Sequence, residues 1–145
     1  MRFGVYLPTC LLARIAGADG WLARGSGTRQ MVKDDVQTIR AHLRRHGRDP
    51  DTLRYGHLNF AHLVKTTDRE EALRLQRPAF ERVMGAHRTF EQLQQSYFLG
   101  TTGEIVERIR DLEAAGIQDI VLGTCDDDLE QLERCASEIV ARFKA

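Results

Sequence analysis

Four stretches of the chain are rich in apolar residues, among them β-branched or aromatic ones. They are residues 2–7, 21–22, 53–64 and 117–122. Short runs of this composition, bounded by Pro, Gly or Asp, are typical of buried strands. The third run is the longest and mixes apolar with polar positions. Such a pattern suits a barrel strand that packs on helices with one side and faces a lumen with the other.

Two segments between these runs carry apolar residues at helical spacing and so predict amphipathic helices. The apolar positions of the first are Val32, Val36, Ile39 and Leu43. Those of the second are Ile105, Val106, Ile109 and Leu112. We expect the first helix to end at Gly47. The second should begin at the capping box of Thr101 and Glu104 and end at Gly116, a good residue for a left-handed C-cap.

A third helix is predicted from a capping-box pattern at Thr67 and Glu70. It contains Pro78, which lacks a backbone N–H and clashes with the preceding turn of a helix. We therefore expect Pro78 to break or kink this helix, with a successor starting at Ala79.

Weaker signals predict the remaining helical segments. Residues 11–16 can form a helical turn or two, and residues 89–99 form a polar helix or loop dotted with aromatic residues. Asp127 can cap a final helix. The residues of that helix expected to point inward are Leu129, Leu132, Ile139, Val140 and Phe143.

The order of these elements alternates strands with helices, which favours a parallel sheet with helical crossovers. A complete (β/α)8 barrel takes about 250 residues, near 30 for each strand–helix unit. The 145 residues of this chain support about four units. The predicted fold is therefore an α/β half-barrel of the TIM type, with about four parallel strands, formed by residues 1–145 as a single domain and completed by oligomerisation.

The charge balance and the cysteine content indicate which ligands and which cellular compartment suit the chain. Lys plus Arg equals Asp plus Glu at 21 each, so nothing predicts attraction to nucleic acid or to an anionic membrane. The cysteines Cys10, Cys125 and Cys135 show no metal-binding or disulfide spacing, and they suit reduced thiols in a cytoplasmic protein. The apolar runs are too short for a signal peptide or a membrane span.

Four segments together resemble the luciferase-like monooxygenases, a family of flavin- or deazaflavin-dependent (β/α)8 barrels. They are MRFGVYLP at the start, ADGWL at residues 18–22, HGRDPDTLRYGHLNF at residues 46–60 and LGTTGEIVERIRDLEAAGIQDIVLG at residues 99–123. The family more often has Pro and Glu where this chain has Thr102 and Gly103. The resemblance covers nearly the whole chain. The central strands of the family would lie between Pro8 and about Leu12 and have no counterpart here.

This resemblance implies a flavin (FMN) or deazaflavin cofactor and an oxidation or hydride-transfer reaction. In the family, much of the cofactor binding falls on loops from the central strands, so no catalytic residue can be transferred to this chain. Active sites of such barrels lie at the carboxyl ends of the strands. The residues expected there are Tyr6, Thr9, Arg24, Ser26, Asn59, His62, Thr124 and Cys125.

Three candidate residues, His57, Arg24 and Cys125, have a simpler alternative. His57, which shares a strand face with Asn59, can donate to a flavin carbonyl or shuttle a proton, but it can also be a hydrogen-bonded interior histidine. We expect the more polar face of that strand to line the lumen. Arg24 with Gly25-Ser26-Gly27 can hold a phosphate or form a plain loop. The acidic residues that follow Cys125 should raise its pKa and leave it unreactive.

The leading hypothesis is therefore an oxidoreductase subunit of the luciferase-like class that forms a homodimer or pairs with a complementary barrel chain. The alternative is a non-catalytic barrel remnant that binds a partner chain or a small ligand, because the cofactor loops are missing. A third possibility, a decayed or shortened gene product, is disfavoured by the intact caps and helical faces.

Overall fold

A parallel sheet forms the centre of the protein. The computed structural model describes residues 4–5, 15, 17–85, 87–126 and 128–143. The strands are β1 (Gly4–Val5), β2 (Gly20–Ala23), β3 (Arg54–Ala61) and β4 (Asp119–Thr124). They lie in the order β1-β2-β3-β4 and all pairs are parallel. Spatial order therefore follows chain order, as in one arc of a barrel, and β3 is the long inner strand of the sheet.

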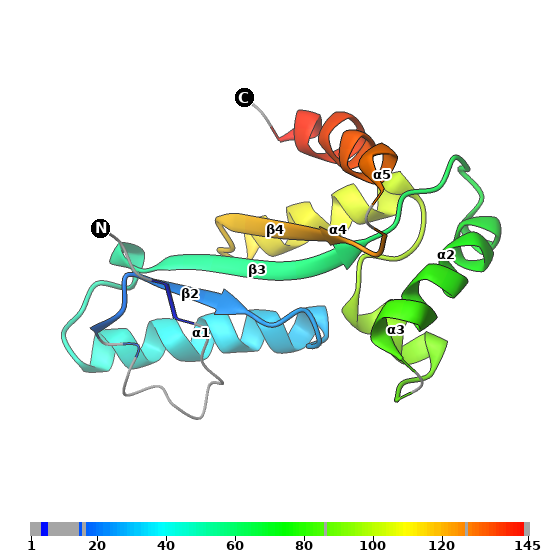
Figure 1. Ribbon diagram of the computed structural model, residues 1–145. Helices are drawn as coiled ribbons and strands as arrows, with labels where there is room; N and C mark the ends of the chain where they lie inside the picture. Colours follow the sequence, from blue (N-terminus) through cyan, green and yellow to red (C-terminus); the bar gives the residue numbers. More distant parts are fainter. Residues whose placement is uncertain (1–3, 6–14, 16, 86, 127, 144–145) are drawn as a thin grey trace.

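Helical segments follow β2, β3 and β4 (Figure 1). Between β2 and β3 lie α1 (Arg29–Arg45) and a short 3-10 helix, η2 (Pro50–Thr52). Between β3 and β4 lie α2 (Arg69–Met84), α3 (Phe90–Ser96) and α4 (Thr102–Ala114). After β4 come α5 (Leu129–Arg134), a π-helical turn η3 (Cys135–Ile139) and a 3-10 turn η4 (Val140–Arg142). The predicted α/β fold with helical crossovers is confirmed.

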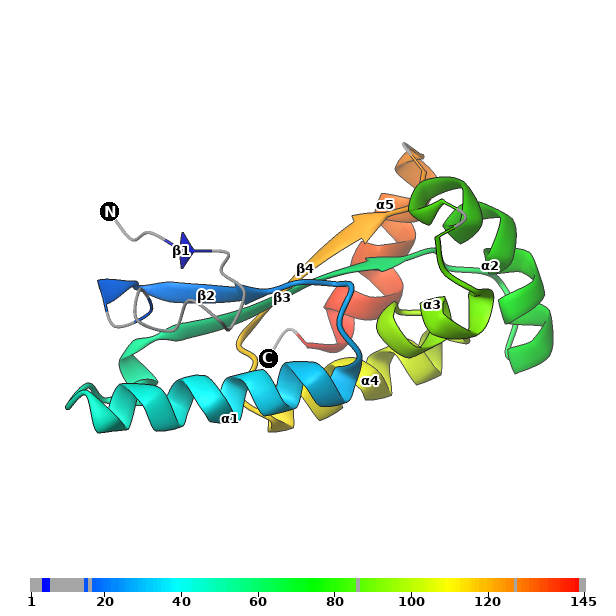
Figure 2. The ribbon, with the colours of Figure 1, turned by 90° about the horizontal axis from the view of Figure 1, so that it is seen from below.

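Helices α1 and α4 cover one face of the sheet, and the main core lies beneath them (Figure 2). From the helices, this core takes the apolar positions that the spacing predicts, among them Ile39, Leu43 and Leu112, none of which exposes any surface. The sheet contributes Trp21, Ala23, Tyr55 and Ala61. Burial of each large apolar side chain stabilises the fold by about 1.5–3 kcal/mol. The two predicted amphipathic helices therefore cover the hydrophobic core.

The opposite face of the sheet remains half exposed. Its larger side chains are Leu22, Leu58, Phe60 and Val121. Val121 is 48% exposed. Glycines lie beside the bulky residues: a Cβ on Gly56 would lie 2.9 Å from Leu22 Cδ1, and a Cβ on Gly123 would lie 2.7 Å from the Phe60 ring. Alternating large and small side chains fill the interior of a small barrel in this way.

The expected break at Pro78 is wrong, because α2 runs without interruption through this residue. Pro78 lies on the exposed side of the helix. The Arg74 carbonyl, which loses its helical N–H donor at this position, also lies on an exposed residue and can bond to water. On the other face of the helix, Ala72 and Phe80 are buried. Their packing keeps the turns before and after Pro78 in one continuous helix.

Two predicted caps shift by one residue. Asp68, not Thr67, caps α2 and accepts a hydrogen bond from the N–H of Glu71. Asp128 caps α5, while Asp127 lies outside the described residues. Aspartate satisfies a helix N-terminus and also favours its positive end, so Asp68 replaces Thr67 as the cap of α2. The capping box of Thr101 and Glu104 is confirmed.

The final helical segment is less buried than the sequence suggests. Ile139 is buried and Phe143 packs against the core, as expected. Leu129 and Leu132 are 68% and 54% exposed, so the expectation that they point inward is wrong. Val140 is 40% exposed and lines an apolar pocket beside Ile139 and Phe143. The buried side of the segment carries Gln131, Cys135 and Ile139 instead, and Gln131 is held there by its hydrogen bonds to the backbone of Leu63.

The strand boundaries also differ from the sequence pattern. β3 ends at Ala61, because the backbone of Leu63 is bonded by side chains instead of a strand: its N–H donates to Gln131 Oε1 and its carbonyl accepts from Gln131 Nε2. β4 begins two residues later than predicted, at Asp119. Of the first predicted strand, only Gly4–Val5 is described, and of the predicted turns at residues 11–16 only Ile15.

Close packing between the β2–α1 loop and β3 yields a first prediction. A Cβ on Gly25 would lie 2.6 Å from the backbone oxygen of Leu58, whereas one on Gly27 would meet nothing closer than 3.8 Å. We expect Gly25→Ala to lower the free energy of unfolding by about 1–3 kcal/mol, because one backbone must move away from the other. Gly27→Ala, the matched control, should change it far less in urea unfolding. Equal effects would contradict this account.

Candidate functional site

The carboxyl ends of β2, β3 and β4 meet at one edge of the sheet, and α2 and α3 lie beyond this edge (Figure 1). Active sites of parallel α/β barrels form at this edge. Gln76 of α2 fixes the arrangement: its amide nitrogen donates to the carbonyls of His62 and Gly100, at 2.7 and 2.9 Å, and its amide oxygen accepts from the N–H of Gly100. We therefore regard this edge as the candidate site.

His57 and Asn59 lie in β3 and form a buried network. The Asn59 amide nitrogen lies 2.9 Å from His57 Nε2 and also donates to the Ser96 carbonyl. The Asn59 amide oxygen accepts from the backbone N–H groups of Phe60 and Phe98. These two N–H groups fix the orientation of the amide, so His57 Nε2 accepts and Nδ1 carries the proton. The network binds the end of α3 to β3.

The expectation that His57 and Asn59 line the lumen is wrong. They alternate with Leu58 and Phe60 and share the face of Tyr55 and Ala61, which packs under α1 and α4. The physical reason is that a buried amide can hydrogen-bond to the backbone where the chain leaves α3, while the open face receives the apolar side chains. The polar side chains of His57 and Asn59 therefore lie on the face of β3 that packs against the helices.

Burial lowers the pKa of His57 to about 4, and the nearby backbone of Ala23 opposes this shift. His57 is 2% exposed, and its Nδ1 meets no partner with hydrogen-bond geometry among the described residues. At neutral pH this imidazole is uncharged and enclosed. In this arrangement it holds Asn59 and does not reach a ligand at the open face.

The loop after β2 contains the predicted phosphate-binding residues. Arg24 is exposed and the Gly27 N–H donates to its carbonyl, at 3.4 Å. The Ser26 carbonyl accepts hydrogen bonds from Arg88 and from the Ser96 hydroxyl. The loop thus packs against α3, and its groups bond to protein atoms. Tyr6 and Thr9 lie outside the described residues.

A cluster lies just after β3 and β4, where the sequence placed His62 and Thr124 but did not single out Asp126 or Arg82. His62 Nδ1 is buried and lies 3.2 Å from a carboxylate oxygen of Asp126 without hydrogen-bond geometry, and Arg82 of α2 forms an ion pair with the same carboxylate. The Thr124 hydroxyl donates to the Asp126 carbonyl, which holds the loop. The sequence shows Asp126 only within an acidic run that suggests helix capping. Only the meeting of two strand ends brings it to His62.

This cluster is suited to proton transfer. Burial and the charges of Arg134 and Arg82 lower the pKa of His62, while Asp128 opposes the shift. A neutral imidazole whose Nδ1 faces a carboxylate keeps Nε2 available to accept a proton. Cys125, the adjacent residue, differs: burial raises the pKa of its thiol to about 11, so it stays protonated at neutral pH. The direction agrees with the sequence prediction, but the cause is burial and not the acidic neighbours.

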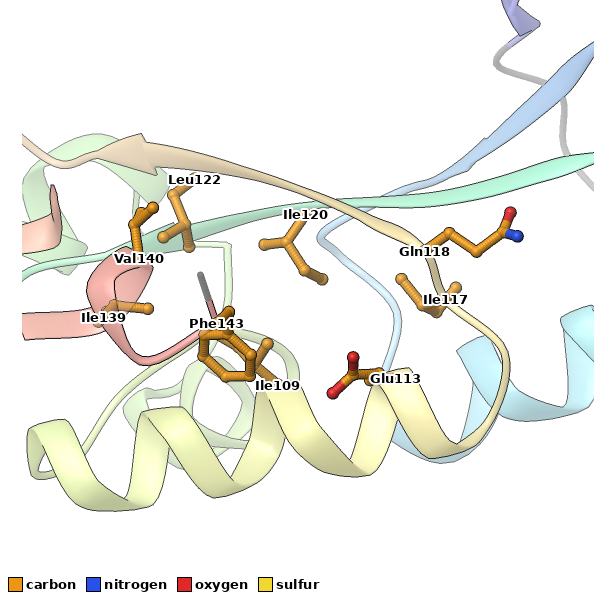
Figure 3. A pocket seen from close by; sticks show the side chains of 9 residues that line it. All are labelled: Ile109, Glu113, Ile117, Gln118, Ile120, Leu122, Ile139, Val140 and Phe143. Atoms are coloured by element: carbon orange, nitrogen blue, oxygen red, sulfur yellow. The ribbon is translucent and has the colours of Figure 1, made fainter. Parts of the chain in front are cut away.

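The cavities described here lie elsewhere. An apolar pocket of about 270 Å³ lies between α4, β4 and the end of the chain (Figure 3). In it, Ile120 and Leu122 of β4 face Ile109 of α4 and Phe143, with Glu113 at one side. A wider hollow of about 760 Å³ follows β3, but its Arg134 and Arg142 already bond to Glu138. Neither cavity includes His57, Asn59, Arg24 or Ser26.

Across residues 17–85, 87–126 and 128–143, with the few described residues before them, no group of three or more His, Cys, Asp or Glu side chains is placed to hold a metal ion. In the same part of the chain, no helix is long and apolar enough to cross a membrane.

The fold and its carboxyl edge define a partial parallel α/β barrel, and solved structures share this arrangement. The coenzyme F420-dependent tetrahydromethanopterin reductase from Methanopyrus kandleri superposes with a TM-score of 0.69 at 14% identity, over 99% of this chain and 51% of its own. An F420-dependent secondary alcohol dehydrogenase in complex with an F420-acetone adduct gives 0.70 at 16%, over 96% and 47%. Monooxygenase RslO1 from Streptomyces bottropensis gives 0.68 at 18%, over 99% and 48%.

These structures belong to the luciferase-like monooxygenase family, so the resemblance seen in the sequence is confirmed as a resemblance of fold. The chain spans about half the length of each of the three. No protein-family model and no curated protein sequence matches the chain. The identities below 20% establish the shared architecture alone.

The buried neutral His57 predicts a pH dependence of stability. The pKa is about 4 in the fold and 6.5 as the reference value, so the unfolded chain binds more protons between these values. His57 therefore favours folding fully above pH 6.5 and loses this contribution as the pH falls towards 4. The loss is on the order of 3 kcal/mol. Urea unfolding of the wild type and of His57→Gln across this range should give curves that diverge with pH, while parallel curves would contradict the assignment.

Proposed function

We propose that the chain is half of a luciferase-like, flavin- or deazaflavin-dependent oxidoreductase barrel, and that it acts only when a second half completes the barrel. The observation that supports this most strongly is the half-length match to F420-dependent enzymes and a monooxygenase. The cofactor class and the reaction class come from those proteins. The half-exposed apolar sheet face supports the need for completion.

The residues of one chain do not fit a flavin by themselves. A cofactor site needs a concave surface with several polar groups directed into it. Here His57 and Asn59 face the helices, and the Ser26 carbonyl and the Gly27 N–H bond within the protein. The exposed Arg24 and the His62–Asp126 pair remain at the carboxyl edge. These two features supply part of a rim, so we assign cofactor binding to the completed barrel.

We propose a second copy of the chain as the completing half. The sheet has two outer strands, β1 and β4, each with one unpaired edge among the described residues. An exposed strand edge pairs readily with another chain, and two copies of a four-stranded arc supply the eight strands of a closed barrel. The alternation of Gly56 and Gly123 with Leu22 and Phe60 suits two such faces that interdigitate. Zero net charge gives little repulsion between copies.

The role we propose for His62 is proton transfer at Nε2, with the Asp126 carboxylate 3.2 Å from Nδ1 and Arg82 paired with Asp126. Oxidoreductases that move hydride also gain or lose a proton on the substrate, and an imidazole near neutrality serves this purpose. This role belongs to the completed barrel. One chain alone lacks the enclosure that would exclude water.

The dimer can be tested at Val121, which is 48% exposed on the open face of the sheet. We expect the wild type to elute at twice the 16.5 kDa of one chain, as measured by light scattering after size exclusion. Val121→Lys should shift it to the monomer, because a charge would be buried in the barrel interior. Val83→Lys, at a position 43% exposed on α2, is the matched control and should remain dimeric. A well-dispersed wild-type monomer at micromolar concentration would contradict the proposal.

Cofactor affinity should follow the oligomeric state. In fluorescence titrations with FMN and with a deazaflavin, we expect saturable binding by the dimeric wild type and by Val83→Lys. The monomeric Val121→Lys should bind at least about tenfold more weakly, since half of the rim is missing. Stoichiometric sub-micromolar binding by a single-chain species would show that one half suffices.

The alternative function, a non-catalytic remnant that binds a partner, is favoured by one observation. The polar groups of the carboxyl edge are largely satisfied within the chain, including both sides of the Asn59 amide. A dimer that binds neither FMN nor a deazaflavin would support this alternative and would overturn the oxidoreductase proposal.

A further inference from the structure

Two histidines on α1 form a pair that the carboxyl edge does not use. His42 and His46 are four residues apart, so they lie one turn apart on the same side of the helix. Their ring centroids are 4.4 Å apart, with 47° between the ring planes. His46 is exposed and ends the helix as its C-cap. The pair therefore lies at the surface, at the amino-terminal end of the sheet.

One nitrogen of this pair lacks a hydrogen-bond partner. His42 Nε2 is buried without a hydrogen bond, whereas the His46 side chain is exposed. Burial, His46 and Arg45 together lower the pKa of His42.

The position on the helix also favours a cation. The last carbonyls of a helix carry partial negative charge, which attracts positive charge within the last turn. Two imidazoles at i and i+4 are a known geometric basis for binding one metal ion. Imidazole nitrogen suits Zn²⁺, Cu²⁺ and Ni²⁺ better than the hard cations Mg²⁺ and Ca²⁺.

We propose that His42 and His46 chelate a divalent transition-metal ion, with water completing its coordination. Because the described residues offer no third ligand at this place, the site is a two-histidine chelate and not an enclosed structural site. The expected order of affinity is Cu²⁺ above Ni²⁺, and Ni²⁺ above Mn²⁺. This site does not depend on the proposed oxidoreductase function.

The test is calorimetric titration of the tag-free chain with Ni²⁺. We expect one ion for each chain. His42→Gln and His46→Gln should each weaken binding at least about tenfold, because a chelate loses its second ligand. His87→Gln, which removes a separate exposed histidine, is the matched control and should bind as the wild type does. His46 is exposed, so its variant keeps the fold even if the His42 variant loses stability.

Two arginine variants give a change in the opposite direction. The charge of Arg45 acts on His42, whereas that of Arg44 acts on Tyr55. We expect Arg45→Gln to strengthen Ni²⁺ binding by about two- to fivefold through loss of repulsion, and Arg44→Gln to change it less. Ni²⁺ should also raise the Tm of the wild type, because it binds the folded helix. Binding that persists in both histidine variants, or that His87→Gln abolishes, would overturn the proposal.

Discussion

The packing of β3 under α1 and α4 is the constraint on which the rest of the structure depends. β3 pairs with β2 on one side and with β4 on the other, and its Tyr55 and Ala61 lie in the core beneath both helices. Because side chains alternate along a strand, this packing directs Leu58 and Phe60 to the opposite face. The packing of one face therefore determines which residues of β3 lie on the other, half-exposed face. The sheet is an arc with helices covering one side.

The same strand organises the carboxyl edge. Asn59 binds the end of α3 through the Ser96 carbonyl and the Phe98 N–H. Beyond the strand end, Gln76 binds the His62 carbonyl, which leaves the His62 ring beside Asp126. The buried network and the more exposed His62–Asp126 pair thus have different roles: the first fixes the chain segments, and the second presents an imidazole nitrogen at the edge.

The open face connects fold and function. F420-dependent enzymes and a monooxygenase of about twice the length share this arc, and in a closed barrel the corresponding face lies in the interior. Here the glycines beside Leu22 and Phe60 preserve the interlocking pattern of an interior. A second half would convert this exposed surface into a barrel core, which is the physical link between dimer formation and cofactor binding in the proposed function.

The sequence by itself determined the alternation of strands and helices, the apolar stripes of α1 and α4, and the cap at Thr101, because these depend on neighbours within a few residues. It also determined the His42–His46 spacing on α1. The tertiary structure decided which face of β3 is buried, because a lumen and a helix layer demand similar alternation. It likewise decided that α2 continues through Pro78, where packing of Phe80 outweighs a local preference. The pairing of His62 with Asp126 joins residues 64 positions apart, and only the parallel alignment of β3 and β4 brings them together.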